Sequence, residues 1–148
     1  MGQKVDVVNQ VGDDVLLELV HDVVHRFRAV LQSSIADDES GLAMMEVRAL
    51  AYLARHDGGT SGELVKRSGR DKGQVARLVG GLVERGLVER APGSDRRSHT
   101  LHLTPEGKTV QRRLERKRVR AAGAMFAPFS TAERSTLAEL LGRLAPRE

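Results

Sequence analysis

Four neighbouring residues near the start of an expected helix carry side chains that are typical of DNA recognition. Gln74 can form two hydrogen bonds to an adenine edge, and Arg77 can do the same with a guanine edge. Lys72 can bind a phosphate oxygen, and Gly73 has no side chain to keep the backbone away from a nucleic acid. These residues are therefore candidates for binding double-stranded DNA in a fold that places the start of this helix in the major groove.

A second candidate group is a short basic loop that holds Asp95, Arg96 and Arg97. A basic loop tip can enter the minor groove of DNA, and a narrow A·T-rich groove attracts arginine most strongly. Asp95 lies two residues before Arg97, and its carboxylate can orient the Arg97 side chain. An isolated loop of this kind is usually a solvated charged turn, so the DNA-binding interpretation depends on the surrounding elements.

His21 and His25 share one face of an expected helix, at the spacing of zinc-binding H-E-x-x-H motifs. However, Asp22 replaces the longer glutamate, Val23 and Val24 belong to an apolar stripe, and the sequence offers no further ligand. We therefore expect no metal. Burial with ordinary hydrogen bonds is the favoured role for the two histidines. The alternative is that they line a ligand pocket between the terminal helices and the central part of the chain.

A basic run occupies residues 112–120, where RRLERKRVR holds six basic residues and one acid. Arg112, Arg116 and Arg120 are four residues apart, so they share one face of a helix. A solvated helix face is the favoured interpretation, and long-range attraction to DNA is the alternative. No site is assigned to this run.

The charge of the chain is unevenly divided. Residues 1–64 hold 5 Lys and Arg against 11 Asp and Glu, whereas the whole chain has a net charge of +4, so the remainder is strongly basic. A basic region is the electrostatic footprint of a surface for a polyanion. The absence of cysteine excludes disulfides and thiolate chemistry. Aromatic residues make up only 3%, which argues against stacking platforms for single-stranded nucleic acid.

The length of 148 residues and the apolar content of 40% are sufficient for a single domain, residues 1–148, with its own core. No apolar run approaches the roughly 20 residues that span a bilayer. The N-terminus lacks the apolar region and the cleavage site of a signal peptide. We expect a cytoplasmic protein with no membrane partner.

The candidate residues of the helix and of the basic loop lie on either side of a tandem repeat, in which GLVER occurs twice in residues 81–90. The structure of this repeat determines where the helix ends and the next element begins. The residues that form one helical stripe up to and within the first copy are Val75, Leu78, Val79, Leu82 and Val83. A helix continuing through the second copy would rotate it by about 140°, which would place Val88 on the polar side. Gly86 can adopt the left-handed conformation that ends a helix. We therefore predict that the helix ends at Arg85 and that a strand begins at Leu87.

Local signals predict a second, shorter helix ahead of this one. Thr60 and Glu63 have the spacing of a capping box, and Gly69 is suited to end the helix. Asp71 can then cap the longer helix, with Gln74 at the reciprocal position.

A hairpin is predicted after the repeat. Residues 91–98 are rich in turn-forming and basic residues, and residues 99–103 alternate with Leu101 and Leu103 on one face. Thr104 then caps a helix that has Pro105 at its first position. Helix, turn, helix and hairpin make a winged helix-turn-helix, which we place in residues 42–103, with a further helix over residues 42–56.

The terminal segments, residues 13–35 and 104–145, are predicted to be helices with apolar stripes, and Ser130 with Glu133 forms a capping box in the second segment. A small winged unit cannot cover so much apolar surface. We therefore expect these segments to be dimerisation helices that are buried against a second subunit.

These motifs and the order of the elements resemble the MarR-type transcriptional regulators. The wing pattern of that family, D-x-R followed by L-x-L-T-x-x-G, is matched by Asp95, Arg97, Leu101, Leu103, Thr104 and Gly107. The preceding pattern, L-x-x-x-G-L-V-x-R, is matched by Leu82, Gly86, Leu87, Val88 and Arg90. The flanking helices and the length also agree, so the resemblance covers nearly the whole chain.

The resemblance implies a mainly α fold with a small β-hairpin wing, flanked by N- and C-terminal dimerisation helices. It also implies a homodimer that reads a pseudo-palindromic operator in double-stranded DNA and that a small-molecule effector releases. It implies neither enzyme activity nor a cofactor.

Two functions remain open at this point. The first is a sequence-specific DNA-binding transcriptional regulator, most simply a repressor released by a small ligand. The second is a winged-helix module that binds another protein without specific DNA binding, in which the basic surface is incidental. Titration against DNA fragments in the presence of competitor DNA separates the two.

Overall fold

The computed structural model describes residues 11–95 and 97–145. In this part of the chain, six helices and a two-stranded antiparallel sheet follow one another. Their bounds are α1 Asp13–Ala36, α2 Met44–Arg55, α3 Ser61–Ser68, α4 Lys72–Glu84, β1 Val88–Pro92, β2 His99–Leu103, α5 Pro105–Phe126 and α6 Thr131–Leu144. The predicted fold class, mainly α with a hairpin wing, is confirmed.

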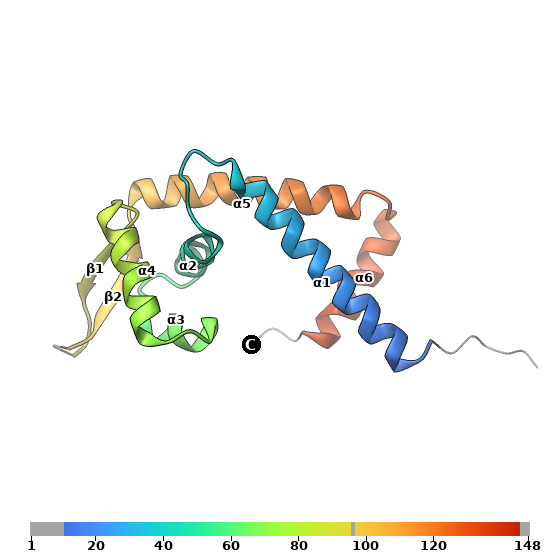
Figure 1. Cartoon of the computed structure of the whole chain (residues 1–148), viewed down its shortest axis with the longest axis horizontal. Helices are drawn as coiled ribbons and strands as arrows, with labels where there is room; N and C mark the ends of the chain where they lie inside the picture. The colour runs from blue at the N-terminus through green and yellow to red at the C-terminus, as the bar shows by residue number, and fades with distance from the viewer. Residues whose placement is uncertain (1–10, 96, 146–148) are drawn as a thin grey trace, which may run out of the picture.

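The long helix α5 connects two parts of the molecule (Figure 1). Helices α2, α3 and α4 and the hairpin lie under its first half, and we call them the winged unit. Helices α1 and α6 lie under its second half, and we call them the terminal helices. The C-terminal end of α1 meets the middle of α5.

One hydrophobic core holds the winged unit on the first half of α5. The most deeply buried side chains are Leu50, Leu53, Val79, Leu82, Leu101 and Leu114. They come from α2, α4, β2 and α5. Because Leu114 lies in α5, this helix is part of the winged unit's core as well as its link to the terminal helices.

The predicted helix starts are confirmed by their capping bonds. The Thr60 hydroxyl accepts a hydrogen bond from the Glu63 N–H at 3.2 Å, and the Glu63 carboxylate accepts one from the Thr60 N–H at 3.0 Å. Asp71, Thr104 and Ser130 accept the corresponding bonds at α4, α5 and α6. Gln74 makes no reciprocal bond among the described residues, so Asp71 caps α4 alone.

The helix predicted over residues 42–56 is shorter than expected. It begins at Met44, because Leu42 is buried in the preceding link and the Glu46 carboxylate accepts a hydrogen bond from the Ala43 N–H at 2.8 Å. It ends at Arg55, with His56 as its C-cap.

The two copies of GLVER form different structures, as predicted. Helix α4 ends at Glu84 with Arg85 as its C-cap, and Gly86 has φ of 70°. The Gly86 N–H bonds the Val83 carbonyl at 2.9 Å, and the Leu87 N–H bonds the Leu82 carbonyl at 3.0 Å. These are the two bonds of a Schellman motif, which satisfies the last carbonyls of the helix.

The hairpin differs from the prediction in its length. Strand β1 starts at Val88, one residue late, and continues through Ala91 and Pro92, which were expected in the loop. These two residues pair with Thr100 and His99. A proline fits here because β1 has a neighbour on one side only, so no ladder bond is lost.

Candidate nucleic-acid interface

The predicted recognition residues lie together on one face of α4. Lys72, Gly73, Gln74 and Arg77 are all exposed in the first half of the helix. The opposite face of α4 is fixed in the core by Val75, Val79 and Leu82. The packing of that inner face sets the direction in which the outer face points. The structure thus brings the four residues together, and their role in binding DNA stays a prediction.

The wing loop is closed by bonds to Ser98. The Gly93 N–H bonds the Ser98 carbonyl at 2.9 Å, and the Ser98 N–H bonds the Asp95 carbonyl at 3.0 Å. Asp95 and Arg97 are exposed at the tip, and Arg96 lies outside the described residues. Within the described residues the Asp95 carboxylate makes no ion pair with Arg97, so the expected orienting contact is not seen.

A histidine ties the hairpin to the link between α2 and α3. The His102 Nδ1 lies 2.9 Å from Asp57 Oδ1, and its Nε2 lies 2.9 Å from the Thr100 hydroxyl. The backbone adds two bonds, from the Gly58 N–H to the Leu101 carbonyl at 3.1 Å and from the Leu101 N–H to the Gly59 carbonyl at 2.8 Å. These contacts hold the base of the wing, and they could not be predicted from local patterns because 45 residues separate His102 from Asp57.

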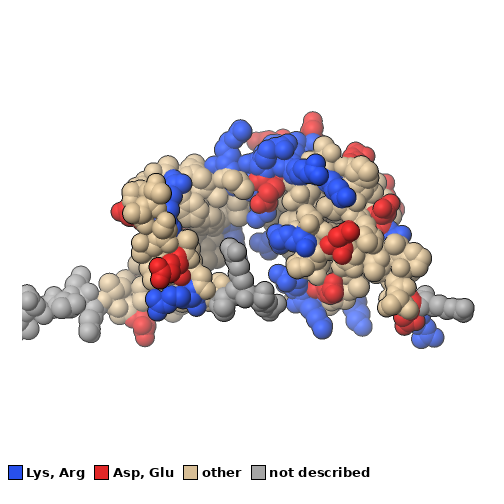
Figure 2. All heavy atoms as spheres, turned by 180° about the vertical axis from the view of Figure 1, so that it is seen from behind, with Lys and Arg blue, Asp and Glu red and all other residues tan. Residues whose placement is uncertain are grey.

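Lys and Arg side chains gather on one face of the molecule (Figure 2). They follow the top of the molecule, where α5 lies, and others border the hollow on the side of the winged unit. The predicted solvated face of α5 is present, because Arg112, Arg116 and Arg120 are all exposed. Two other members of the same run, Arg113 and Lys117, bind the buried Asp38 and are therefore not part of that face.

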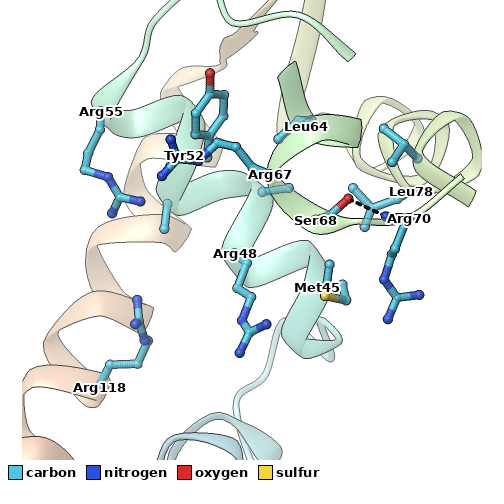
Figure 3. Close-up of a pocket in the computed structure, with 13 residues that line it drawn as sticks. Met45, Arg48, Tyr52, Arg55, Leu64, Arg67, Ser68, Arg70, Leu78 and Arg118 are labelled. Atoms are coloured by element: carbon cyan, nitrogen blue, oxygen red, sulfur yellow. Dashed lines mark hydrogen bonds between the residues drawn. The ribbon is translucent and has the colours of Figure 1, made fainter. Parts of the chain in front are cut away.

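A cavity of about 280 Å³ opens in the winged unit (Figure 3). Its apolar wall comes from α2, α3 and α4 and includes Met45, Leu64, Val75 and Leu78. Five arginines also line it, namely Arg48, Arg55, Arg67, Arg70 and Arg118. No acidic residue is among its described lining residues. Because the lining comes from four helices, sequence periodicity could not reveal this cavity.

Most of these arginines have no carboxylate partner in the described part of the chain. Arg118 pairs with Glu115 at 2.8 Å, but its Nε is buried without a hydrogen-bond partner among the described residues. Arg67 lies over the Tyr52 ring at 5.2 Å from the centroid, which is a cation–π contact. Several arginines without a carboxylate partner beside an apolar wall favour the binding of an anion in this cavity.

Tyr52 and Glu63 fix the edge of the cavity. The Tyr52 hydroxyl donates to the Glu63 carboxylate at 2.9 Å, and the same oxygen accepts the Thr60 N–H. The bond from the Thr60 backbone and then the bond from Tyr52 hold the pKa of Glu63 below its ordinary value. Burial and the Glu63 contact raise the pKa of Tyr52. The two residues hold α2 against α3.

His21 and His25 do not line this cavity. Both side chains are exposed on α1, so the expected burial with ordinary hydrogen bonds is wrong for the single chain. Their assignment to a ligand pocket stays a prediction. Among residues 11–95 and 97–145, no group of three or more histidine, aspartate or glutamate residues could hold a metal ion.

The terminal helices present broad apolar faces to the outside. On α1 the exposed residues include Val15, Leu16, Leu19, Val20 and Val23, and on α6 they are Leu140, Leu141 and Leu144. No residue of α6 is buried. None of the helices in the described ranges is long and apolar enough to cross a membrane.

Comparison with known proteins identifies related sequences. A model of the MarR family matches residues 40–98. A protein of Thauera aromatica described as a transcriptional regulatory protein for the hcr operon is 34% identical over 96 residues, 64% of this chain and 58% of its own. The HTH-type transcriptional regulator PetP of Rhodobacter capsulatus is 35% identical over 57% of this chain and 54% of its own. The chain thus spans little more than half the length of these relatives.

Solved structures show the same fold. Wild-type MarR from E. coli in its apo form superposes with a TM-score of 0.77 and 23% identity, covering 88% of this chain and 96% of that chain. A mutant of the same protein in complex with operator DNA gives a TM-score of 0.70 at 23% identity, covering 88% and 94%. These similarities establish a winged helix-turn-helix between terminal helices.

Proposed function

We propose that the chain is a MarR-type, sequence-specific transcriptional regulator that binds double-stranded DNA, and the match of a MarR family model to residues 40–98 supports this proposal. The observation that carries the proposal is the outer face of α4, where Lys72, Gly73, Gln74 and Arg77 are exposed together at the start of a firmly packed helix. A helix inserted in the major groove reads base edges mainly with residues near its N-terminus. Residues 42–103 form the DNA-binding portion in this proposal.

The proposal includes a wing contact. Asp95 and Arg97 lie at the hairpin tip, which extends away from α4, and a cation there can reach the minor groove beside the major-groove contact. Arg96, which lies outside the described residues, is included in the proposal as their neighbour in the sequence. The bonds of His102 and Leu101 to the link between α2 and α3 keep the hairpin at a fixed angle to the recognition helix.

The proposal also includes a homodimer that reads a pseudo-palindromic operator. The exposed valines and leucines of α1 and α6 support it, because a contiguous apolar face of this size is normally buried by a partner. Residues 13–35 and 104–145 are the dimerisation helices in this arrangement. A closed twofold pair places two winged units against one face of a duplex.

A small anionic effector completes the proposed function, with release of DNA as its consequence and repression as the resting activity. The arginines around the cavity supply bidentate donors for a carboxylate or phosphate, and the apolar wall suits an attached hydrocarbon group. Val75 and Leu78 line the cavity from the inner side of α4. An occupant therefore touches the back of the helix that faces DNA.

The experiment is a binding titration with DNA from upstream of the protein's own gene, in excess competitor DNA and at several salt concentrations. The expected result is one preferred duplex, with log K falling against log[salt] by about 0.9 for each phosphate contacted. Equal affinity for all duplexes and no salt response would overturn the proposal in favour of a protein-binding module. A regulator of this kind acts in the cytoplasm, where the chromosome is accessible, and needs neither a catalytic site nor a cofactor.

A further inference from the structure

Asp38 is the one buried charged residue in the described part of the chain. It lies in the link between α1 and α2, and its side chain is only 1% exposed. Burial of a carboxylate is costly unless its oxygens are fully bonded. The surroundings of Asp38 therefore have to compensate the charge.

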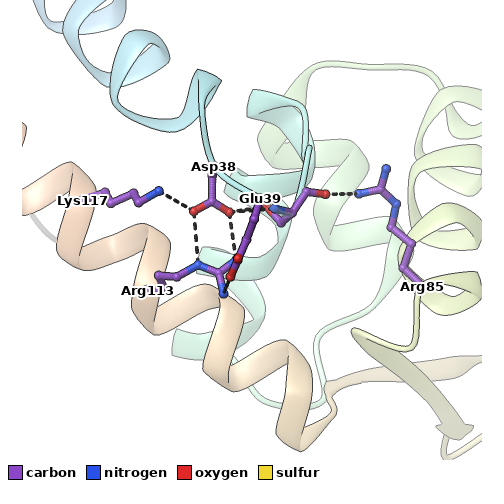
Figure 4. A network of polar contacts seen from close by, with 6 residues as sticks. Asp38, Glu39, Arg85, Arg113 and Lys117 are labelled. Carbon is purple, nitrogen blue, oxygen red and sulfur yellow. Dashed lines mark hydrogen bonds and ion pairs between the residues drawn. The ribbon is translucent and has the colours of Figure 1, made fainter.

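Five donors satisfy this carboxylate (Figure 4). Arg113 donates from Nε at 3.2 Å and from Nη2 at 2.9 Å, and Lys117 donates from Nζ at 2.6 Å. Ser40 donates from its backbone N–H at 3.1 Å and from its hydroxyl at 2.6 Å. Arg113 and Lys117 are one helical turn apart on α5, so the carboxylate is held against one face of that helix.

The same link is also bonded to the recognition helix. Arg85, the C-cap of α4, donates from Nη1 to the Ser40 carbonyl at 3.0 Å. Ser40 therefore bonds Asp38 through its N–H and hydroxyl and bonds Arg85 through its carbonyl. A continuous set of polar contacts runs from the end of α4, through residues 38–40, to the middle of α5 (Figure 4).

The position of this network in the fold suggests its purpose. The winged unit is joined to the terminal helices by only two stretches of chain, which are the link from α1 to α2 and the continuous helix α5 (Figure 1). Asp38 fastens one stretch to the other. A buried ion pair contributes little net stability compared with an apolar pair of the same size, but it demands a defined geometry.

We propose that Asp38 is a positioning residue for operator reading, which fixes the angle between the winged unit and the terminal helices. The inference rests on the proposed function, because the angle matters only where two winged units must fit one duplex. In a twofold dimer, the angle in each chain sets the distance and rotation between the two α4 helices. Asp38 thereby determines which half-site spacing the protein accepts.

A spacing change of one base pair is a demanding test of this geometry. It moves one half-site by about 3.4 Å and turns it by roughly 34° around the duplex. A dimer with a fixed angle cannot follow both half-sites, whereas a dimer with a loose angle can adjust. Loss of the Asp38 contacts should therefore broaden the range of accepted spacings more than it weakens binding to the best one.

The experiment compares the wild-type protein with Asp38→Asn on the preferred operator and on the same operator with one base pair inserted between its half-sites. For the wild type we expect at least about a tenfold loss of affinity on the altered spacing. For Asp38→Asn the loss should shrink to about threefold or less. Leu53→Ala, which removes core contacts away from the link, is the control for simple destabilisation and should keep the wild-type ratio.

A second measurement needs no DNA. Because the chain has no cysteine, Lys66→Cys introduces a single spin-label position on the exposed side of α3 in each copy. The distance distribution between the two labels should be narrow in the wild-type background and clearly broader with Asp38→Asn. If Asp38→Asn does not fold, Lys117→Met removes one donor and leaves the Arg113 contacts, and a smaller broadening is expected.

The outcomes separate the inference from the function on which it rests. A wild-type protein that prefers no duplex would contradict the proposed function, and the label distances would still test the fixed angle. A wild-type protein that discriminates spacing, with Asp38→Asn or Lys117→Met retaining both the same ratio and the same distance distribution, would overturn the positioning role of Asp38.

Discussion

Gly107, in the first turn of α5, lies so close to the carbonyl oxygen of Leu87 that no side chain fits between them. A Cβ atom built on Gly107 would overlap that oxygen. The contact belongs to a tight junction, in which the Thr104 N–H bonds the Leu87 carbonyl at 3.1 Å and the Thr104 hydroxyl bonds the Gly86 carbonyl at 2.6 Å. The start of α5 is thereby fastened to the point where α4 ends and β1 begins.

The first prediction follows from this contact. Gly107→Ala should force the start of α5 away from Leu87 and lower the free energy of unfolding by roughly 3 kcal/mol, as overpacking of a core does. Gly80→Ala is the matched control, because nothing lies within 4 Å of its added Cβ, and there the free energy should rise by up to about 1 kcal/mol. Urea denaturation measures both. Equal effects of the two substitutions would show that the junction can shift freely.

The second prediction separates the recognition helix from the wing. Gln74→Ala or Arg77→Ala should remove a base contact and cost roughly 1 to 3 kcal/mol on the preferred operator, with less effect on random duplex. Arg97→Ala should instead weaken both duplexes evenly and reduce the salt slope by about one per subunit.

Binding series on operator and scrambled DNA at several salt concentrations measure these effects, with Arg28→Ala on α1 as the control for loss of an exposed arginine. An unchanged affinity and slope for Arg97→Ala would exclude the wing as a DNA contact. The same result for Arg77→Ala would mean that the outer face of α4 does not bind DNA.

The third prediction concerns the arginine-lined cavity. Phthalate, an aromatic dianion, should raise the melting temperature more than benzoate, because two charges meet more of the arginines. Arg48→Gln and Arg67→Gln should each reduce the phthalate shift, whereas Arg28→Gln, which lies outside the cavity, should not. A thermal melt with phthalamide as the uncharged analogue decides whether charge matters, since an equal shift from phthalamide would contradict an anion site.

The fourth prediction concerns pH and Asp38. The bonds from Arg113, followed by those from Lys117 and Ser40, outweigh burial and hold the Asp38 pKa far below its ordinary value of 3.8. A lowered folded-state pKa stabilises the fold above the unfolded pKa, and this contribution is lost as the pH falls below it. At pH 7, Asp38→Asn should lower the free energy of unfolding by about 3 kcal/mol, because Lys117 loses its carboxylate partner and Arg113 keeps only its pair with the exposed Glu39.

The difference in the free energy of unfolding between Asp38→Asn and the wild type should shrink as the pH is lowered from 5 toward 2. The wild type then loses the stabilisation by the Asp38 carboxylate, which the variant lacks at every pH. Denaturant titrations at each pH measure this difference in the free energy of unfolding. A difference that stays constant over this range would mean that the charge of Asp38 does not stabilise the fold.

The fifth prediction concerns assembly. Leu19→Glu on α1 and Leu140→Glu on α6 place a charge in faces that are about half exposed in the single chain, at 53% and 49%. Either substitution should shift the protein from dimer to monomer and weaken operator binding, because an unpaired charge at an apolar interface is costly. Sedimentation velocity measures the shift, with Glu18→Gln on the same helix as the control. Dimers of unchanged stability in both variants would place the interface elsewhere.

The features that sequence predicted correctly are those determined by nearby residues. Gly86 ends α4 because its own conformation and two backbone bonds close the helix, and Thr60 starts α3 through a partner three residues away. Such signals lie within one turn of chain, so a single sequence contains them. The same reasoning put Ala91 and Pro92 in a loop, because residue preferences did not reveal that pairing across the hairpin would continue through them.

The features that sequence missed depend on distant residues. Asp38 and Arg113 are 75 positions apart, and only the crossing of the α1–α2 link over α5 brings them together. In the sequence, Arg113 and Lys117 cannot be distinguished from the solvated arginines around them. The cavity was missed for the same reason, because its arginines come from helices whose arrangement depends on tertiary packing. Capping rules and helical periodicity carry no information about such contacts.

The uncovered valines and leucines of α1 and α6 also bear on how many copies of the protein a cell must hold. In the proposed homodimer these faces are covered only when two chains meet, so the stability of the fold rises with total protein concentration. Below the dissociation constant of the dimer, the amount of dimer falls with the square of the free subunit concentration. Occupancy of the operator would then follow gene dosage more steeply than for a monomeric regulator, and the abundance of the protein would itself set a threshold for the genes it controls.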